Sequence, residues 1–542
     1  MANPAGRNSK ASALAHFALT ALAIGVAWWW LGAPVELPPS PLANGGKLYC
    51  VSYAPFRGQQ DPLVESTTVT AAQIEEDLTI LSRYTDCIRT YSVDHGLDQI
   101  PAIAQRHGLK MMLGIWLSND PVKNSQQITT GIALANQFPD VVRSVVVGNE
   151  TLLRGELSST DLAARIREVK TQVSVPVTYA DVWEFWLRYS DLRYAVDFVT
   201  IHILPYWEDF PLPAAVAAAH VDSIRHRVAA AIPDKEIMIG EVGWPSAGRM
   251  REGARPSPSN QARVIGETLT LAQRENFRVN VIEAFDQPWK RWLEGPSGRY
   301  WGIFDRHTGK PKFSFSGLVS DHPQWPLQAL AGIVLAGLVF AAAWYGRRGT
   351  AGPPLLWTWV AIQGFLPGIL FGWTLEAVPV DSYTAGTWVR SLAFAVTAAA
   401  APILCAAACA AGRPRPTFAA VFARSGQARD RWSIALGAVF IMLVILSVET
   451  ALGLVFDPRY RDIPFAPQSG GVAAFLVLML STARPAGPRA AAERVAAAVL
   501  ALSAGYIAIN ETFANWQAIW LCGGFLALAL ILVRARDELG SG

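Results

Sequence analysis

The stretch IMIGEVGWPSAG, residues 237–248, ends an apolar run in Glu241 and then turns at once through Gly-Trp-Pro. The stretch VVRSVVVGNE, residues 141–150, has the same design, because a Val-rich run delivers Asn149 and Glu150 to its end. Parallel strands that are buried on both faces have nearly continuous apolar sequences. Two carboxylates are therefore expected at the ends of two parallel strands.

Apolar strand-like runs alternate eight times with helix-period segments between residues 47 and 320, which is the pattern of βαβ units that close a barrel. Residues at the carboxyl ends of barrel strands line the mouth of a (β/α)₈ TIM barrel, so the two glutamates should converge there. The predicted strands are 48–54, 86–91, 109–115, 141–148, 176–181, 196–203, 235–240 and 278–285, and the clearest helices are 71–84 and 160–173.

A single glutamate at a strand end is more often a capping or salt-bridged residue than a catalyst. Two of them in one barrel mouth, each with distinctive neighbours, favour a pair that cleaves glycosidic bonds. In a retaining mechanism the two groups lie about 5 Å apart. One carboxylate then stays ionised, while burial and its partner's charge raise the pKa of the other.

The 542-residue chain has two parts that differ in charge and hydropathy. Residues 36–325 carry 33 acidic and 29 basic side chains, whereas the remainder carries 10 acidic and 17 basic ones and most of the long apolar runs. We expect an α/β barrel domain at 36–325, a cytoplasmic tail with a transmembrane anchor at 1–35, and an all-α polytopic membrane domain at 326–542. The last would contain about seven transmembrane helices.

The anchor is the apolar run 13–31, which follows Arg7 and Lys10 and contains the triplet Trp28–Trp30. Its length is enough to span a bilayer, and tryptophans mark the interface. A cleavable signal peptide is the alternative, but it would have a shorter apolar region and a small-residue cleavage site. The aromatic triplet favours an uncleaved anchor.

Further apolar runs follow at 327–345, 355–375, 388–411, 433–455, 470–482, 495–510 and 516–533, of which 470–482 is short for a span. Arginines fall on alternate connections, so the positive-inside rule makes those connections and both termini cytoplasmic. The intervening connections face outward with the barrel. The arginines are Arg347, Arg348, Arg413, Arg415, Arg424, Arg429, Arg431, Arg484, Arg489, Arg494, Arg534 and Arg536.

Two acidic residues, Glu449 and Glu511, stand at the outward ends of predicted spans. Acidic groups are costly in hydrocarbon, so they are candidates for function, with interfacial exposure as the alternative. Cys50 and Cys87 lie in the first two predicted strands and are expected to be buried free thiols, because no metal-ligand spacing or dense disulfide framework is visible.

The motifs GNE (148–150) and GEVGWPSAG (240–248) resemble those of the family 17 glycoside hydrolases, a β-1,3-glucanase family with a retaining (β/α)₈ barrel. The resemblance spans about residues 47–320 and includes CIRTYS, VDFVTIHILPYW, VIEAFDQPWK and WGIFDRHTGKPK. It implies that Glu150 is the acid/base and Glu241 the nucleophile. His202 stands where many relatives have Asn.

The resemblance also implies that Tyr206 orients the nucleophile and that Glu283 and Lys290 bind glucose hydroxyls. Asn149 is placed to bind the sugar 2-hydroxyl. Tryptophans in the loops after strands offer flat faces for stacking on sugar rings, with barrel packing as the equal alternative. The remaining expected substrate-binding residues at strand ends are Tyr53, Arg89, Tyr91, His202, Trp244 and Trp289.

The sequence thus predicts a β-glucan transglycosylase or endo-hydrolase that acts on β-1,3-linked, β-1,6-branched glucan at the periplasmic face of a bacterial inner membrane. The expected partners are β-glucan, the lipid bilayer and, as a candidate, a glucan synthase; no nucleic acid, metal or cofactor is expected. The alternative is a glucan synthase or export component in which the barrel binds or processes the emerging chain. The predicted cytoplasmic connections are too short for a nucleotide-sugar transferase domain.

Overall fold

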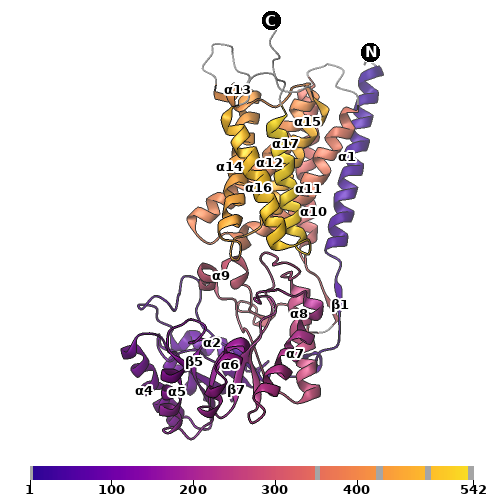
Figure 1. The fold of residues 1–542 in the computed structure, drawn as a ribbon. Helices are drawn as coiled ribbons and strands as arrows, with labels where there is room; N and C mark the ends of the chain where they lie inside the picture. Colours follow the sequence, from indigo (N-terminus) through magenta and orange to yellow (C-terminus); the bar gives the residue numbers. More distant parts are fainter. Residues whose placement is uncertain (1–3, 316, 348–354, 423–430, 483–489, 535–542) are drawn as a thin grey trace. The chain divides into compact units, whose positions relative to one another are not determined.

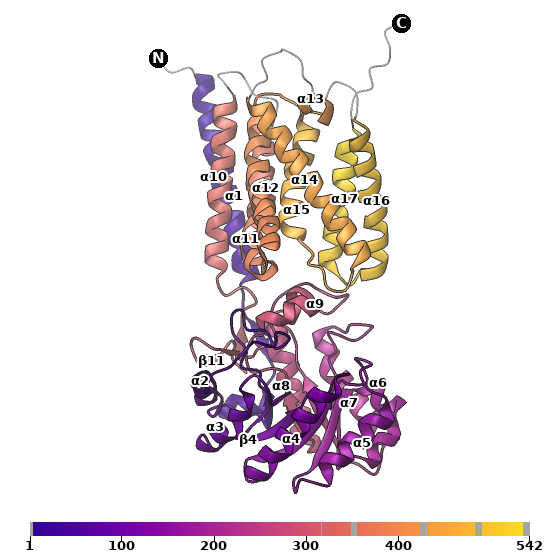
Figure 2. The same ribbon diagram turned by 90° about the vertical axis from the view of Figure 1, so that its left-hand side faces the viewer.

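Eight parallel strands close into a barrel in the order in which they occur in the chain (Figures 1 and 2). The computed structural model describes residues 4–315, 317–347, 355–422, 431–482 and 490–534. Every strand predicted from the sequence is present, so the (β/α)₈ class is confirmed. The strands are β2 (Cys50–Ser52), β3 (Cys87–Arg89), β4 (Lys110–Ile115), β5 (Val142–Asn149), β6 (Val177–Val182), β7 (Val199–His202), β8 (Ile237–Val242) and β9 (Val279–Val281).

Helices follow the strands and bury their apolar faces against the barrel, as the connections of a βαβ series require. Several begin at a side chain that accepts a backbone N–H in the first turn, at Thr70, Asp120, Ser158 and Ser257. The helices are α2 (Ala71–Leu81), α3 (Ile100–Arg106), α4 (Pro121–Gln137), α5 (Ser159–Lys170), α6 (Trp183–Arg188), α7 (Ala214–Ala231), α8 (Pro258–Glu275) and α9 (Arg291–Gly298).

Two short antiparallel pairs complete this unit. Strand β1 (Val35–Leu37) pairs with β12 (Gly317–Val319), and β10 (Phe304–Asp305) pairs with β11 (Lys310–Pro311). The first pair joins the two ends of the barrel segment in sequence.

The expectation of free thiols at the first two barrel strands is wrong. Cys50 of β2 and Cys87 of β3 form a disulfide across adjacent strands, with Cα atoms 4.3 Å apart. The two cysteines are 37 residues apart in sequence, and they become neighbours only when β2 and β3 pair in the barrel, so the sequence did not indicate this disulfide. Cys405, Cys409 and Cys522 are buried free thiols of the helical unit.

The second unit is a bundle of long apolar helices, with α1 beside α10 (Figures 1 and 2). Within the described residues, seven helices are long and apolar enough to cross a membrane. An eighth, α15, has 17 residues and starts five residues before the predicted run. The helices are α1 (Pro4–Leu31), α10 (Trp325–Gly346), α11 (Leu356–Asp381), α12 (Ala385–Ala410), α14 (Arg431–Phe456), α15 (Phe465–Ser481), α16 (Ala491–Glu511) and α17 (Trp516–Val533), with a short α13 (Phe418–Phe422).

The two compact units do not follow the predicted boundaries throughout. The helical unit contains residues 1–33, 248–252 and 320–542, and the barrel unit contains 34–247 and 253–319. A five-residue segment inside the predicted barrel domain is therefore grouped with the helices.

Charged side chains inside the helical unit are paired. Arg390 of α12 binds Glu449 at 2.7 Å and Asp462 at 2.6 Å, and buried Arg415 binds buried Glu493 of α16 at 3.2 Å. Such pairing is what removes the cost of placing charge among apolar helices. Of the arginines used for orientation, Arg348, Arg424, Arg429, Arg484, Arg489 and Arg536 lie outside the described residues.

The disulfide leads to a first prediction. Protein purified without reductant, unfolded in detergent and treated with a maleimide should be labelled at Cys405, Cys409 and Cys522, because only thiols react. Intact-mass measurement counts the labels, and prior reduction serves as the control that exposes all the cysteines. Labelling of Cys50 and Cys87 without reduction would contradict the pairing.

Candidate active site

Glu150 and Glu241 are held at the carboxyl ends of two barrel strands. Glu150 directly follows β5, and its own backbone has φ 51°, in the left-handed region that non-glycine residues seldom adopt. Its N–H donates to the carbonyl of Ala180 at 2.8 Å, which fixes the turn. Glu241 belongs to β8 and is 4% exposed. The turn at Glu150 and the strand β8 together direct both carboxylates to the same part of the barrel mouth.

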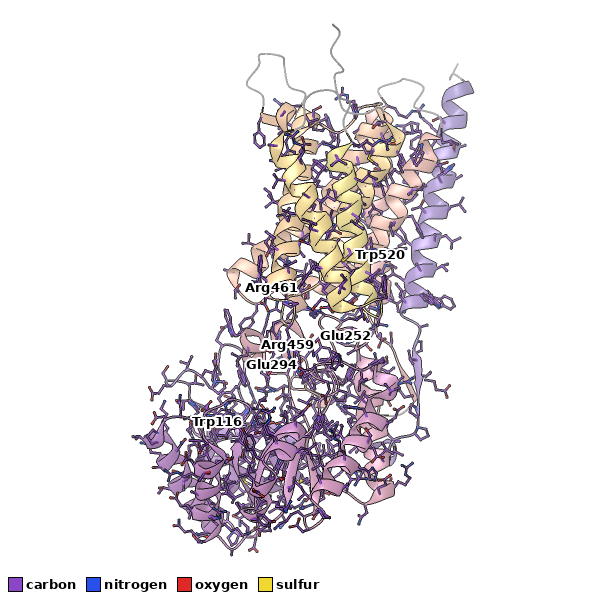
Figure 3. The ribbon with its side chains drawn as sticks, viewed as in Figure 1. Trp116, Glu252, Glu294, Arg459, Arg461 and Trp520 are labelled. Atoms are coloured by element: carbon purple, nitrogen blue, oxygen red, sulfur yellow. A yellow bond between two sulfur atoms is a disulfide. The ribbon has the colours of Figure 1, made fainter. Side chains whose placement is uncertain are left out.

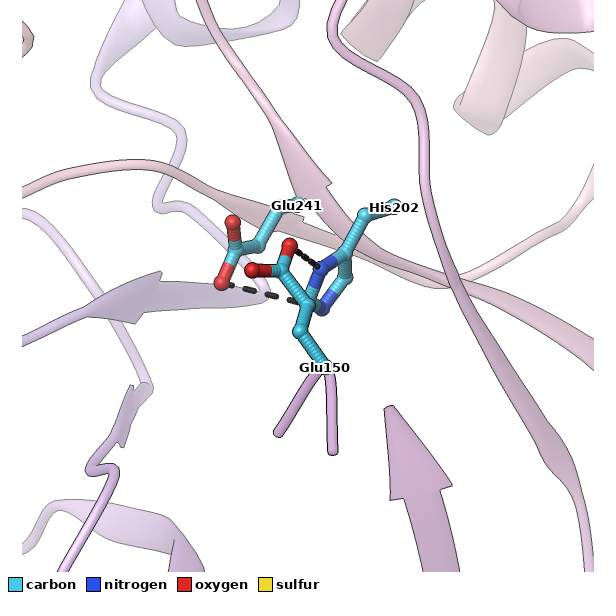
Figure 4. A group of neighbouring side chains, drawn as sticks. All are labelled: Glu150, His202 and Glu241. Carbon is cyan, nitrogen blue, oxygen red and sulfur yellow. Dashed lines mark hydrogen bonds and ion pairs between the residues drawn. The ribbon is translucent and has the colours of Figure 1, made fainter. Parts of the chain in front are cut away.

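His202, the last residue of β7, contacts both carboxylates (Figure 4). Its Nδ1 is 2.8 Å from Glu150 Oε1, and its Nε2 is 3.6 Å from Glu241 Oε1. One ligand atom from each of these three residues lies within 4.8 Å of the others. This separation of the carboxylates fits a retaining enzyme, which needs about 5 Å.

A buried arginine links the same groups. Arg89 Nη1 lies 3.1 Å from Glu241 Oε1, 3.3 Å from His202 Nε2 and 2.7 Å from the carbonyl of Gly240. Its Nη2 donates to Asn149 Oδ1 at 2.5 Å. Arg89 and Asn149, expected to bind substrate, therefore bind each other, and Arg89 also binds the Glu241 carboxylate.

The hydrogen bond to Glu150 assigns a proton to one ring nitrogen of His202. The Glu150 carboxylate can only accept a hydrogen bond, so the ring nitrogen that faces it, Nδ1, carries a proton. Nδ1–H then donates to Glu150. The close approach of this ring explains Gly240, since a Cβ there would lie 3.1 Å from the imidazole Cδ2 and 2.3 Å from Thr200 Cγ2.

The pKa of Glu150 differs in direction from the raised value expected for the acid. Burial alone raises this pKa, but the hydrogen bond from His202 and the positive charges of Arg154 and Arg89 outweigh it and lower the pKa. The prediction considered only burial and the second carboxylate. It missed the donor, which holds Glu150 as a carboxylate before substrate enters.

Tyr91 is the tyrosine whose hydroxyl hydrogen-bonds to the Glu241 carboxylate. This hydroxyl lies 2.8 Å from Glu241 Oε1 and 2.9 Å from Ser52 Oγ, so it donates to the carboxylate and accepts from the serine. The hydroxyl of Tyr206 donates to Ser297 at 2.7 Å, and its role in orienting the nucleophile stays a prediction. Sequence spacing could not separate the two tyrosines, because both follow strand ends.

Glu283 and Lys290 form a buried pair at 2.9 Å. Burial raises the pKa of Glu283 to about 7, against the lowering effect of Lys290. Glu294, which the sequence reading missed, also has its pKa raised to about 7 by burial and lies within electrostatic reach of Lys290 and Glu150. Its position four residues after Lys290, on the next helical turn, was the available signal.

Three aromatic predictions have different outcomes. Trp244 is fully buried and packs edge-on against Tyr206, so its expected role as a stacking surface is wrong. Tyr53 is also buried, and its hydroxyl donates to Asp77 at 3.1 Å, so it does not present that group to a substrate. Trp289 is half-buried and keeps one part of its ring accessible.

Tyr179 and Asp181 on β6 support the Glu150 turn and were not assigned this role from the sequence. The Tyr179 hydroxyl accepts the N–H of Leu152 at 3.0 Å and donates to Asp181. Burial and the nearby charge of Glu150 raise the pKa of Asp181 to about 6, although the hydrogen bond from Tyr179 opposes this.

The trio of Glu150, His202 and Glu241 also has the spacing of a metal site. Arg89 contacts two of the three residues, and its fixed positive charge disfavours a cation at the same place. The donor set is therefore better suited to moving a proton than to holding a metal.

Paired glutamates at the ends of β5 and β8 of a closed (β/α)₈ barrel are the arrangement expected of a glycoside hydrolase. Residues 50–302, a little under half of the chain, match the family described as BtgE/BtgC glycoside hydrolase domain. The barrel is therefore similar to glycoside hydrolase domains, and the comparisons indicate an enzyme.

Named relatives are similar to the same part of the chain. A glucan 1,3-beta-glucosidase of Candida albicans is 27% identical over 266 residues, covering 44% of this chain and 85% of that protein. A glucan 1,3-beta-glucosidase of Schizosaccharomyces pombe is 28% identical over 235 residues, covering 40% of this chain and 72% of that protein. The family 17 beta-1,3-glucanosyltransferase structure from Rhizomucor miehei is 25% identical with a TM-score of 0.43, covering 49% and 95% of the chains.

The histidine leads to a second prediction. His202→Ala removes the donor that lowers the pKa of Glu150, so this pKa should rise. The alkaline limb of kcat/KM, which reports the acid, should move to higher pH by the same amount, while the acid limb stays.

His202→Asn is the matched variant, because a carboxamide can still donate to Glu150 and should give a smaller shift. An alkaline limb that stays in place or moves to lower pH in His202→Ala would show that His202 does not set the protonation of Glu150.

Proposed function

We propose that this protein is a retaining β-glucan transglycosylase and endo-hydrolase, with Glu241 as nucleophile and Glu150 as acid/base. The observation that carries the proposal is the approach of the two carboxylates around His202, with ligand atoms within 4.8 Å. A short separation of the two carboxylates favours the retaining mechanism over the inverting one, which needs space for a water molecule.

The chemistry follows from the contacts of each group. Arg89 and Tyr91 donate to Glu241 Oε1, which stabilises the carboxylate and leaves Oε2 to attack the anomeric carbon. Glu150 takes up a proton when the glucan binds, gives it to the leaving oxygen, and returns to the carboxylate form in which His202 holds it. In that form it deprotonates the acceptor that releases the sugar from Glu241.

β-1,3-Linked glucan is the proposed substrate, since the named relatives are glucan 1,3-beta-glucosidases. Branching through β-1,6 bonds is part of the same proposal. Transfer to a sugar is favoured over transfer to water when aromatic faces hold an acceptor beside the intermediate, because positioning raises its effective concentration. Trp289 and Trp292, which is 62% exposed, are the aromatic residues after β9 that suit this role.

We place the enzyme in a bacterial inner membrane, with the barrel in the periplasm and both termini in the cytoplasm. Eight helices of the helical unit serve as spans, counting α15, and residues 36–325 and 326–542 serve as catalytic and membrane domains. Arg347, Arg413, Arg494 and Arg534 on alternate connections support this orientation. The Cys50–Cys87 disulfide supports an oxidising compartment for the barrel. A glucan synthase is the proposed partner.

Product analysis tests the proposal directly. The full-length protein in detergent, given laminaripentaose at millimolar concentration, should form products longer than five sugars, which mass spectrometry and linkage analysis would detect. Glu241→Gln keeps the size of the side chain but cannot attack, so it should lower both transfer and hydrolysis by at least about a thousandfold.

Release of short sugars with no longer or newly branched products would contradict the transfer proposal. Activity of Glu241→Gln within tenfold of wild type would contradict the assignment of the nucleophile.

A further inference from the structure

Glu150 starts a tight turn, residues 150–155, whose backbone is bound by the neighbouring strand β6. The carbonyl of Glu150 accepts the N–H of Arg154 at 2.9 Å, which closes the turn on itself. The N–H of Leu152 instead donates to the hydroxyl of Tyr179 at 3.0 Å. A buried N–H needs such a partner, because leaving it unpaired costs about as much as a lost hydrogen bond. Tyr179 thus binds the turn two residues after Glu150.

The ring of Tyr179 is itself held in place. It is 1% exposed and packs against Trp186, with ring centroids 5.7 Å apart, and Trp186 Nε1 donates to the carbonyl of Thr200 at 2.8 Å. On the other side lies Gly148, which has φ 85° and whose added Cβ would be only 3.3 Å from Tyr179 Cε2. The hydroxyl of Tyr179 therefore has a fixed place beside the turn.

Asp181 orients this hydroxyl. Its carboxylate is fully buried, and Oδ2 accepts the Tyr179 proton. A phenol has one proton to give, so a hydroxyl that donates to Asp181 presents its oxygen to the N–H of Leu152. The N–H of Val182 donates to Oδ1 at 2.8 Å, and the N of Leu153 lies 3.4 Å from Oδ2. The carboxylate thus contacts the turn directly and through Tyr179.

The far end of the turn is fixed by a different contact. The guanidinium of Arg154 lies 4.0 Å from the ring centroid of Trp116, which is labelled in Figure 3. Its Nη2 donates to the carbonyl of Leu117 at 2.7 Å, and its Nε pairs with Glu156 at 2.8 Å. Because this end is anchored to the loop after β4, the contacts with β6 decide the conformation of the part nearest Glu150.

The charge of Asp181 also acts on the catalytic group. Three titratable side chains face the Asp181 carboxylate, namely Tyr179 of the same strand, Glu150 after β5 and His202 of β7. Burial raises the pKa of Asp181 to about 6, and the negative charge of Glu150 adds to this rise against the hydrogen bond from Tyr179. Repulsion between two charges is mutual, so ionised Asp181 makes the Glu150 anion less stable. The groups that favour the Glu150 anion are His202, Arg154 and Arg89.

We propose that Asp181 and Tyr179 are positioning residues for the acid/base. The pair holds the turn that directs Glu150 toward the glycosidic oxygen, and the Asp181 carboxylate counterbalances the groups that favour the Glu150 anion. The inference rests on the proposed function for its reaction. It gives Glu150, which His202 holds as a carboxylate, a neighbour that helps it take up a proton when glucan binds.

Tyr179→Phe in the full-length protein tests the hold on the turn, because it removes the hydroxyl and leaves the ring. Hydrogen exchange measured by mass spectrometry should be at least about tenfold faster at the amide of Leu152, since that N–H loses its acceptor. With laminaripentaose, kcat should fall about tenfold to a hundredfold, as expected for a small displacement of a catalytic group, whereas KM should stay within about twofold.

Asp181→Asn tests the charge. Without the negative group the pKa of Glu150 should fall, so the alkaline limb of kcat/KM should move to lower pH. This direction is opposite to that expected for His202→Ala. A residue that only supports the fold would change the amount of active enzyme and leave the limb in place. Asp181→Ser, which also lacks the charge, replaces Asp181→Asn if that variant fails to accumulate.

Thr178→Val is the matched control, since it removes a buried hydroxyl from the same strand. Thr178 Oγ1 donates to the carbonyl of Phe198 at 2.7 Å and lies 2.9 Å from Thr200 Oγ1, so its bonds run toward β7 and not toward the Glu150 turn. This variant should leave kcat, the alkaline limb and the exchange of the Leu152 amide unchanged.

Unchanged exchange and kcat in Tyr179→Phe would overturn the proposal, as would equal effects of Thr178→Val. An alkaline limb that stays in place or moves to higher pH in the Asp181 variant would overturn the part assigned to its charge. Failure of the proposed function looks different. Inactivity of the wild-type enzyme on laminaripentaose would count against the substrate, whereas hydrogen exchange reports the hold on the turn without any turnover.

Discussion

The buried guanidinium of Arg89 is the constraint on which the catalytic site depends. It contacts Glu241, His202 and Asn149, which come from three other strands of the barrel. A charge at this depth is tolerated only when it is paired and hydrogen-bonded. The residues that accept hydrogen bonds from Arg89 include Glu241 and lie beside Glu150. The contacts that stabilise the buried charge of Arg89 therefore also position the catalytic side chains.

The two carboxylates have different environments for this reason. Glu241 receives donors from Arg89 and Tyr91, whereas Glu150 receives one from His202 and has its pKa lowered. The site without sugar is thus set for base chemistry, and the acid form of Glu150 must be created by substrate binding. This arrangement suits an enzyme that must deprotonate a sugar hydroxyl as often as it protonates a leaving group.

Much of the fold could be predicted from the sequence, because apolar runs and their spacing report strands and the barrel order directly. The ends of β5 and β8 also revealed Glu150 and Glu241. Which side chains turn inward could not be predicted, since this depends on the register and twist of neighbouring strands. Trp244 and Tyr53 were therefore assigned to the substrate although both are buried, and the Cys50–Cys87 pair was missed.

The anomeric configuration of the first product tests the central claim most directly. Proton NMR during the first minutes of turnover on a β-1,3-gluco-oligosaccharide distinguishes the two anomers before they equilibrate. The separation of Glu150 and Glu241 predicts that the β-anomer forms first, through two displacements at the same carbon. Initial formation of the α-anomer would show a single displacement and would contradict the assignment of Glu241 as nucleophile.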